Sequence, residues 1–286
     1  FTGAKGILGE GMGMVRLGIA FALAGVLGSG AEFVIRSYLN NVADLEVVGL
    51  YNTGYVMTMT YAGMIFSAME TDFFPRLSAA NANWLSCNEI VNKQIEVCLL
   101  LISPMLVFAQ FAVPYVIPIL FSSQFLPVVD MMRILLLALY LRAVKLPIAY
   151  LPLAKGDSMS YLLLEAVYDV VIVLSVLWGY ELWGLIGTGV AVALSALFDY
   201  CLILAYAHFK YHYRMTKAVM GYMVIHILIG VIAYVIAANT EGWQWWIGGV
   251  LVMCVSLTAT LYTLHRKVSL WNKLVSNFKN RFRRHG

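Results

Sequence analysis

The stretch LYNTGYVMTMTYAGMIFSAMETDFFPRLS, residues 50–78, decides the fold class of this chain. Its first twenty residues carry no charge, and a helix of that length crosses a hydrocarbon core of ~30 Å. Six hydroxyl-bearing side chains interrupt the apolar run: Tyr51, Thr53, Tyr55, Thr58, Thr60 and Tyr61. Because lipid solvates such groups poorly, the stretch predicts a spanning helix whose polar face meets other helices or water.

The same stretch ends abruptly in charged residues. Glu70, Asp72 and Arg76 follow the apolar run, together with the helix breaker Pro75. A spanning helix that has a polar face and is followed by charged residues indicates a transport pathway.

The composition of the chain confirms the membrane assignment. Hydrophobic residues make up 62% of the 286 residues and charged residues 12%, with a mean hydropathy of +0.81, whereas about a quarter of a soluble domain is charged. The four cysteines, Cys87, Cys98, Cys201 and Cys254, form no CxxC pair and predict neither a disulfide framework nor a zinc site. Phe1 is not an initiator methionine, which suggests a chain that begins inside a longer protein.

Hydropathy and turn residues predict an all-α, polytopic membrane bundle. A glycine-rich loop (1–12) precedes the first span, a polar connector covers 70–90, and Pro104, Pro114 and Pro118 are expected to kink or break the third span. The eight expected spans are 13–39, 50–69, 91–120, 128–151, 159–178, 182–207, 217–237 and 244–264. Residues 265–286 read as a basic amphipathic tail on an anionic membrane surface.

Basic residues predict the orientation. They concentrate in the N-terminal segment and in the second, fourth and sixth loops, whereas the first, fifth and seventh loops have none and the third has at most Arg133. By the positive-inside rule both termini are cytoplasmic, which agrees with an even number of spans.

Charged residues inside the spans are the candidate functional residues, because each is costly in lipid. Four of them fall at similar depth when counted from the turn at Gly156, and Asp199, nine residues before His208, falls in a similar layer. The five residues are Arg142, Lys145, Glu165, Asp169 and Asp199. They could form a buried ion-pair network that locks three helices. They could instead be a coupling site whose carboxylates take up H⁺ or Na⁺.

Other patterns carry no chemistry. GLIGTG, residues 184–189, lies inside an expected span and predicts helix packing rather than a dinucleotide loop. His208 and His212 have no third ligand, so no metal is expected. Nothing in the sequence indicates catalysis, a cofactor or nucleic-acid binding.

Five segments together resemble the lipid-linked oligosaccharide flippases. These are the O-antigen and capsule translocases of the polysaccharide transporter family, within the multidrug/oligosaccharidyl-lipid/polysaccharide exporter (MOP) superfamily. The resemblance covers roughly residues 10–210 and is carried by AEFVIRSYLN, GLYNTGY with YAGMIFSAMETDFFPRLSA, QFLPVVDMM, LPIAYLPLAKGDSMSYLLLE and WGLIGTGVA.

The resemblance implies the C-terminal part of a flippase of the bacterial inner membrane, with membrane lipids around it. Residues 1–207 would form the second six-helix lobe and 208–264 two additional helices, while an absent N-terminal lobe would supply the other wall of the cavity. The whole protein would move undecaprenyl-pyrophosphate-linked oligosaccharide between leaflets by alternating access, without breaking a bond.

The resemblance also implies the substrate contacts. Arg16 and Arg36 would face the pyrophosphate, because a guanidinium binds phosphate oxygens bidentately, and Tyr51, Tyr55 and Tyr61 would face the sugars. For Arg36 the alternative is an intrahelical pair with Glu32.

Two alternative functions stay open. One is a drug/cation antiporter or a peptidoglycan-precursor flippase of the same superfamily. The other is a membrane glycosyltransferase or polymerase, which the short first, third, fifth and seventh loops disfavour.

Overall fold

The computed structural model describes the backbone of residues 2–266 and the side chains of residues 15–265. Within this range it is all-helical. The elements are α1 (Thr2–Val42), α2 (Leu45–Tyr55), the π-helical turn η1 (Val56–Thr60), α3 (Tyr61–Ala79), α4 (Trp84–Leu120), the 3-10 turn η2 (Ser123–Phe125), α5 (Val128–Ala154), α6 (Ser158–Tyr211), α7 (Lys217–Asn239) and α8 (Gly242–Arg266).

Six of the described helices are long and apolar enough to cross a membrane: α1, α4, α5, α6, α7 and α8. The chain is therefore a multi-pass membrane protein. The expected span 50–69 appears as the unbroken succession of α2, η1 and α3. The amphipathic tail lies outside the described residues, apart from the end of α8.

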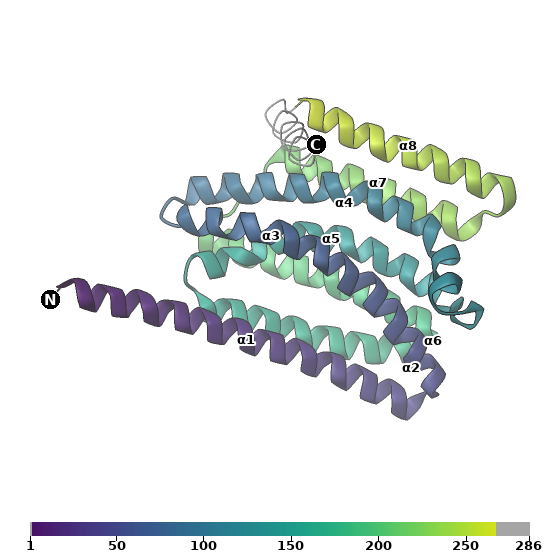
Figure 1. The fold of residues 1–286 in the computed structure, drawn as a ribbon, viewed down its shortest axis with the longest axis horizontal. Helices are drawn as coiled ribbons and strands as arrows, with labels where there is room; N and C mark the ends of the chain where they lie inside the picture. The colour runs from purple at the N-terminus through teal and green to yellow at the C-terminus, as the bar shows by residue number, and fades with distance from the viewer. Residues whose placement is uncertain (1, 267–286) are drawn as a thin grey trace, which may run out of the picture.

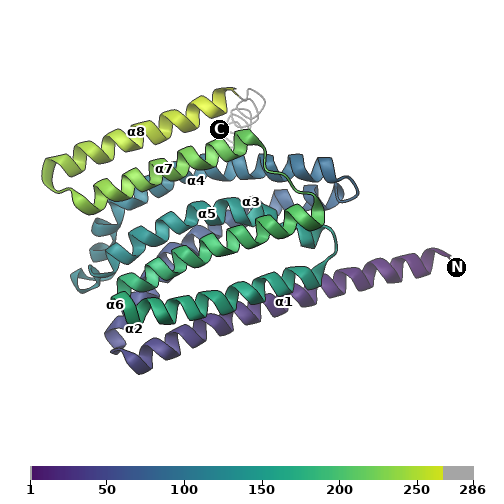
Figure 2. The ribbon, with the colours of Figure 1, turned by 180° about the vertical axis from the view of Figure 1, so that it is seen from behind.

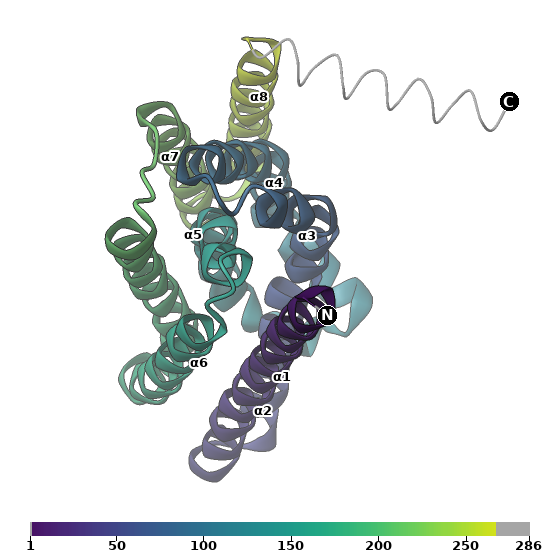
Figure 3. The same ribbon diagram turned by 90° about the vertical axis from the view of Figure 1, so that its left-hand side faces the viewer.

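Apart from α2 and α3, which follow one another in the same direction through η1, the helices run antiparallel to their chain neighbours along the long axis (Figure 1). The end view shows α5 in the middle of the bundle (Figure 3), and it packs against α2, α3, α4, α6 and α7. Most of the α5 side chains are buried accordingly. This one helix therefore holds the other layers together.

Two expected interruptions are absent. Residues 2–12 begin α1 rather than forming a loop, and only residues 80–83 separate α3 from α4. Asn83 caps the start of α4, since its side chain accepts hydrogen bonds from the amides of Leu85 and Ser86. Local capping therefore lets the helices continue into the segment expected to be a polar connector.

Of the kink or break expected in the third span, the break is absent, because α4 continues through its three prolines. A proline leaves the carbonyl four residues earlier without its helical donor. For Pro104 this carbonyl is Leu100 O, and Thr260 Oγ1 of α8 donates to it at 3.4 Å. A neighbouring helix thus satisfies the freed group, as membrane helices require.

The longest helix, α6, is a hairpin. Trp183 and Gly184 have non-helical backbone angles, with φ of +57° at Gly184, and the chain turns back there so that the returning limb lies beside the first one (Figure 2). The two limbs touch at glycines: a Cβ on Gly187 would lie 1.9 Å from Gly179 O. The GLIGTG segment therefore serves helix packing, as predicted.

We predict that Gly187→Ala destabilises the protein by ~1–3 kcal/mol, because the added methyl forces the two limbs apart. The measurement is thermal unfolding of the purified protein in detergent. Gly221→Ala is the control, since no atom lies within 4 Å of a Cβ added there. Equal melting temperatures for the two variants would contradict the close approach.

Candidate functional site

A cavity of about 360 Å³ lies between α1, the α2–η1–α3 segment, α5 and both limbs of α6. We call it the central cavity. All five residues of the predicted charged cluster line it: Arg142, Lys145, Glu165, Asp169 and Asp199. The depth count from the Gly156 turn therefore places residues of α5 and α6 beside one another, as expected.

Lys145 is shared by two carboxylates. Its Nζ lies 2.9 Å from Glu165 Oε1 and 3.0 Å from Asp199 Oδ2, and the lysine side chain is only 9% exposed. Glu165 belongs to the first limb of α6 and Asp199 to the second. This triad ties α5 to both limbs of the hairpin and leaves one negative charge unbalanced.

Asp169 and Arg142 line the same cavity without joining the triad. Asp169 Oδ2 is buried and has no hydrogen-bond partner among the described residues. The Arg142 guanidinium makes a long contact of 3.8 Å with Met59 Sδ and pairs with no carboxylate in the described part of the chain. Both groups are therefore available to a ligand or an ion.

The cavity is acidic overall. Five carboxylates face two cations, since Glu32 of α1 and Glu70 of α3 join Glu165, Asp169 and Asp199. Four tyrosines add polar hydroxyls and ring faces to the wall: Tyr55, Tyr150, Tyr161 and Tyr168.

Of the predicted substrate contacts, only Tyr55 lines the central cavity. Tyr51 is 3% exposed and stacks on Tyr55 with 5.7 Å between ring centroids. Tyr61 is 55% exposed and lies outside the lining, because residues six apart do not share a helix face. The structure therefore places Tyr51 and Tyr61 away from the cavity surface.

The two predicted arginines also lie outside the lining of the central cavity. Arg36 Nη2 pairs with Glu32 Oε2 at 2.8 Å within α1, so the intrahelical alternative describes its geometry. Arg16 is exposed near the start of the same helix. Neither arginine is positioned to contact a ligand within this cavity.

Sequence reasoning missed two acidic lining residues. The sequence marks Glu70 only as a charged residue at the end of a span, and Glu32 only as the partner of Arg36. The helical spacing of Met59, Gly63, Ser67 and Glu70 marks one face of the segment, and all four line the cavity. That periodicity is the signal that could have identified Glu70.

A groove of about 550 Å³ adjoins the central cavity between α1 and α3. It shares Phe21, Ser67, Glu70 and Tyr150 with the cavity lining. Apart from Glu70, its wall is largely apolar, with Leu17, Phe74, Pro75 and Leu153. The central cavity therefore continues sideways between two helices.

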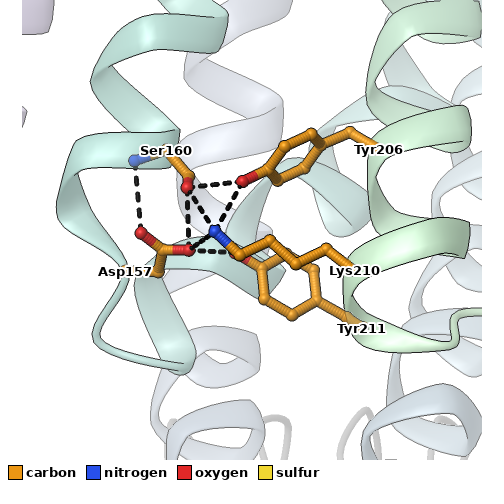
Figure 4. Close-up of polar contacts among 5 residues, drawn as sticks. All are labelled: Asp157, Ser160, Tyr206, Lys210 and Tyr211. Carbon is orange, nitrogen blue, oxygen red and sulfur yellow. Dashed lines mark hydrogen bonds and ion pairs between the residues drawn. The ribbon is translucent and has the colours of Figure 1, made fainter.

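A second polar cluster closes the α5–α6 turn (Figure 4). Lys210 Nζ lies 2.5 Å from Asp157 Oδ2, and Tyr211 donates to the same oxygen at 2.7 Å. Burial raises the pKa of Asp157, but the hydrogen bonds from Lys210, Tyr211 and Ser160 outweigh it and lower the pKa to about 2. An ionised Asp157 thus fastens the turn to the end of α6.

Within the described side chains, no group of three or more His, Cys, Asp or Glu could hold a metal ion. The charged groups of the central cavity can instead bind a cation or a polar headgroup through carboxylates, Arg142 and tyrosine hydroxyls.

Comparison with solved structures identifies the fold. The outward-facing conformation of a multidrug resistance MATE family transporter of the MOP superfamily matches 91% of this chain with a TM-score of 0.59 and 13% identity. A MOP superfamily transporter from Pyrococcus furiosus matches 87% of the chain at 16% identity and a TM-score of 0.47. The chain spans 66% and 64% of these two proteins, slightly less than two thirds of their length.

No curated protein sequence matches the chain. A family model does: residues 10–130, from α1 to the start of α5, match the family described as polysaccharide biosynthesis protein. These findings agree with the resemblance predicted from the sequence: residues 10–130 are similar to the polysaccharide biosynthesis protein family, and the chain has the fold of the MATE family transporter.

Proposed function

We propose that this chain forms one wall of a flippase that moves an undecaprenyl-pyrophosphate-linked oligosaccharide across the bacterial inner membrane by alternating access. The observation that carries the proposal is the central cavity. Its α1 and α3 walls lie in the matched segment 10–130. The groove between α1 and α3 would let a lipid tail stay in the membrane while a headgroup enters.

The transport step needs no covalent chemistry from the protein. Tyrosine ring faces and hydroxyls would contact the sugars, and Arg142 is the cation of this cavity without an ion-pair partner among the described residues. A pyrophosphate carries more negative charge than one arginine balances. The proposal therefore requires further cations from the N-terminal lobe that would face this wall.

The proposed topology has eight spans. The two limbs of α6 and the α2–η1–α3 segment give three spans, which add to the five single helices α1, α4, α5, α7 and α8. Residues 1–207 would then form a six-span lobe and 208–264 two further spans. The turns at 80–83, 155–157 and 212–216 share one end of the bundle (Figure 1). Basic residues in or near these turns, namely Arg76, Lys155 and Arg214, support a cytoplasmic location.

A second candidate function is export of organic cations coupled to H⁺ or Na⁺. The observation that favours it is the acidic excess of the central cavity, together with the unpartnered Oδ2 of Asp169. A buried carboxylate oxygen without a donor is a site where a cation or a proton can bind. The two functions differ in the charge of the substrate.

We predict that Asp169→Asn abolishes transport in the full-length protein while its abundance stays normal, because no described residue depends on Oδ2 for a hydrogen bond. Asp199→Asn should lower abundance instead, since it removes one partner of the buried Lys145. The measurement is surface polysaccharide in a strain that lacks its own flippase, with membrane protein quantified in parallel.

Three outcomes are informative for this pair of variants. Wild-type polysaccharide in Asp169→Asn would remove Asp169 from the pathway. Loss of the Asp169→Asn protein itself would support a purely structural network. If the wild-type gene restores no polysaccharide but confers resistance to cationic drugs, the cation exporter is the better assignment.

The topology gives a separate prediction. In a background with all four cysteines replaced, Cys at Asn41 or Glu241 should react with an impermeant maleimide added to intact cells. Cys at Asn81 or Arg214 should not, although all four positions are exposed in the structure. Labelling of Arg214→Cys from outside would reverse the proposed orientation.

A further inference from the structure

A separate cavity of about 330 Å³ lies at the end of the bundle where α4 ends and α7 turns into α8 (Figure 1). It shares no lining residue with the central cavity. Its polar and aromatic lining consists of Tyr115, Arg133, Thr240, Glu241, Trp245 and Trp246. We call it the α7–α8 cavity.

Arg133 is the one basic residue of this cavity lining, and its hydrogen bonding is incomplete. The side chain is 10% exposed, and Nη1 makes a 3.3 Å contact with Asp130 Oδ1. Nε is buried and has no partner in the described part of the chain. Nε and Nη2 together form the side edge of a guanidinium, which binds two oxygens of one phosphate. The structure therefore leaves Nε, one of the two donors of this phosphate-binding edge, without a partner among the described residues.

Aromatic rings form the wall beside Arg133. The Trp245 ring centroid lies 5.6 Å from that of Tyr115 and 4.9 Å from that of Trp246. Tyr115 and Trp246 are at least half exposed. Tryptophan and tyrosine at the ends of spans mark the membrane interface, where lipid headgroups lie. Aromatic faces also attract ammonium groups.

The charges of the α7–α8 cavity select among lipid headgroups. Arg133 supplies one positive charge, while Glu241 in the lining and Asp130 beside it supply two negative ones. A headgroup with only negative charge would meet these carboxylates unfavourably. A headgroup that joins a phosphate to an ammonium satisfies both signs.

We propose that the α7–α8 cavity binds a zwitterionic phospholipid headgroup, with the phosphate on the free edge of Arg133 and the ammonium between Glu241 and the aromatic rings. The exposed apolar residues of α8, such as Val250 and Leu251, would then lie along the acyl chains. This site is independent of the proposed transport function. It also gives a role to Arg133, which lies at the end of the bundle where positive charge is otherwise scarce.

The test is lipid retention by the purified full chain. Delipidated protein in detergent is offered equal amounts of phosphatidylethanolamine and phosphatidylglycerol, and bound lipid is counted by native mass spectrometry. The wild type should prefer phosphatidylethanolamine. Arg133→Gln should reduce binding of both lipids by about tenfold, the loss expected for a charge-assisted hydrogen bond. Arg133→Lys should restore binding only in part, because an ammonium lacks the two-donor edge.

Two further variants complete the design. Glu241→Gln changes an exposed residue and should remove the preference for phosphatidylethanolamine while phosphatidylglycerol binding stays the same or rises. Arg76→Gln is the matched control, because Arg76 is an exposed arginine paired with Asp72 at the other end of the bundle. Its lipid retention should equal that of the wild type.

The proposal is overturned if the wild type retains both lipids equally, or if Glu241→Gln leaves the preference unchanged. Stabilisation of the protein by a free disaccharide but not by phosphatidylethanolamine would also overturn it and would assign the cavity to a sugar. If Arg133→Gln does not fold, Glu241→Gln decides the question, since its exposed side chain makes no ion pair with a described residue.

Discussion

A single ammonium group shared by two carboxylates holds the central cavity together. Lys145 of α5 pairs with Glu165 on one limb of α6 and with Asp199 on the other. Removing one member of such a buried network costs ~3–5 kcal/mol, because a charge is left without its partner. The triad fixes the position of the α6 hairpin against α5, and with it the wall that carries Asp169.

The triad also contributes to the negative charge of the central cavity. One lysine cannot balance two carboxylates, so the triad has an excess of negative charge. Glu32, Glu70 and Asp169 add further carboxylates to the lining and make the cavity acidic. An anionic headgroup would need compensating cations from the opposite wall, whereas a cation would not. In the proposed flippase the substrate would therefore depend on both walls, of which this chain would form the acidic one.

Hydropathy and turns predicted much of the fold. The expected spans 128–151 and 217–237 agree closely with α5 and α7, because Gly156 and the basic loop after α6 give clear boundaries. The charged cluster was predictable for the same reason, since counting from a turn gives depth. The rotation of each helix about its own axis was not predictable, because the residues that face lipid and the residues that face protein are both apolar. For this reason the sequence does not distinguish Tyr55, which lines the central cavity, from Tyr51 and Tyr61, which do not.

Local pairing explains two further differences between the structure and the sequence predictions. Arg36 satisfies Glu32 on its own helix and so does not reach the cavity, and α4 continues through Pro104 because Thr260 of a distant segment satisfies the freed carbonyl. Such compensation comes from residues far apart in the chain, so periodicity within one segment gives no sign of it.

The most direct test of the central claim is reconstitution of the full-length protein into vesicles that carry lipid-linked oligosaccharide with a labelled sugar. An impermeant glycosidase then reports how much of the label is accessible from outside. The account predicts that the protein makes nearly all of the label accessible, while protein-free vesicles protect the inner half. Continued protection of that half, with transport of an organic cation in the same vesicles, would contradict it.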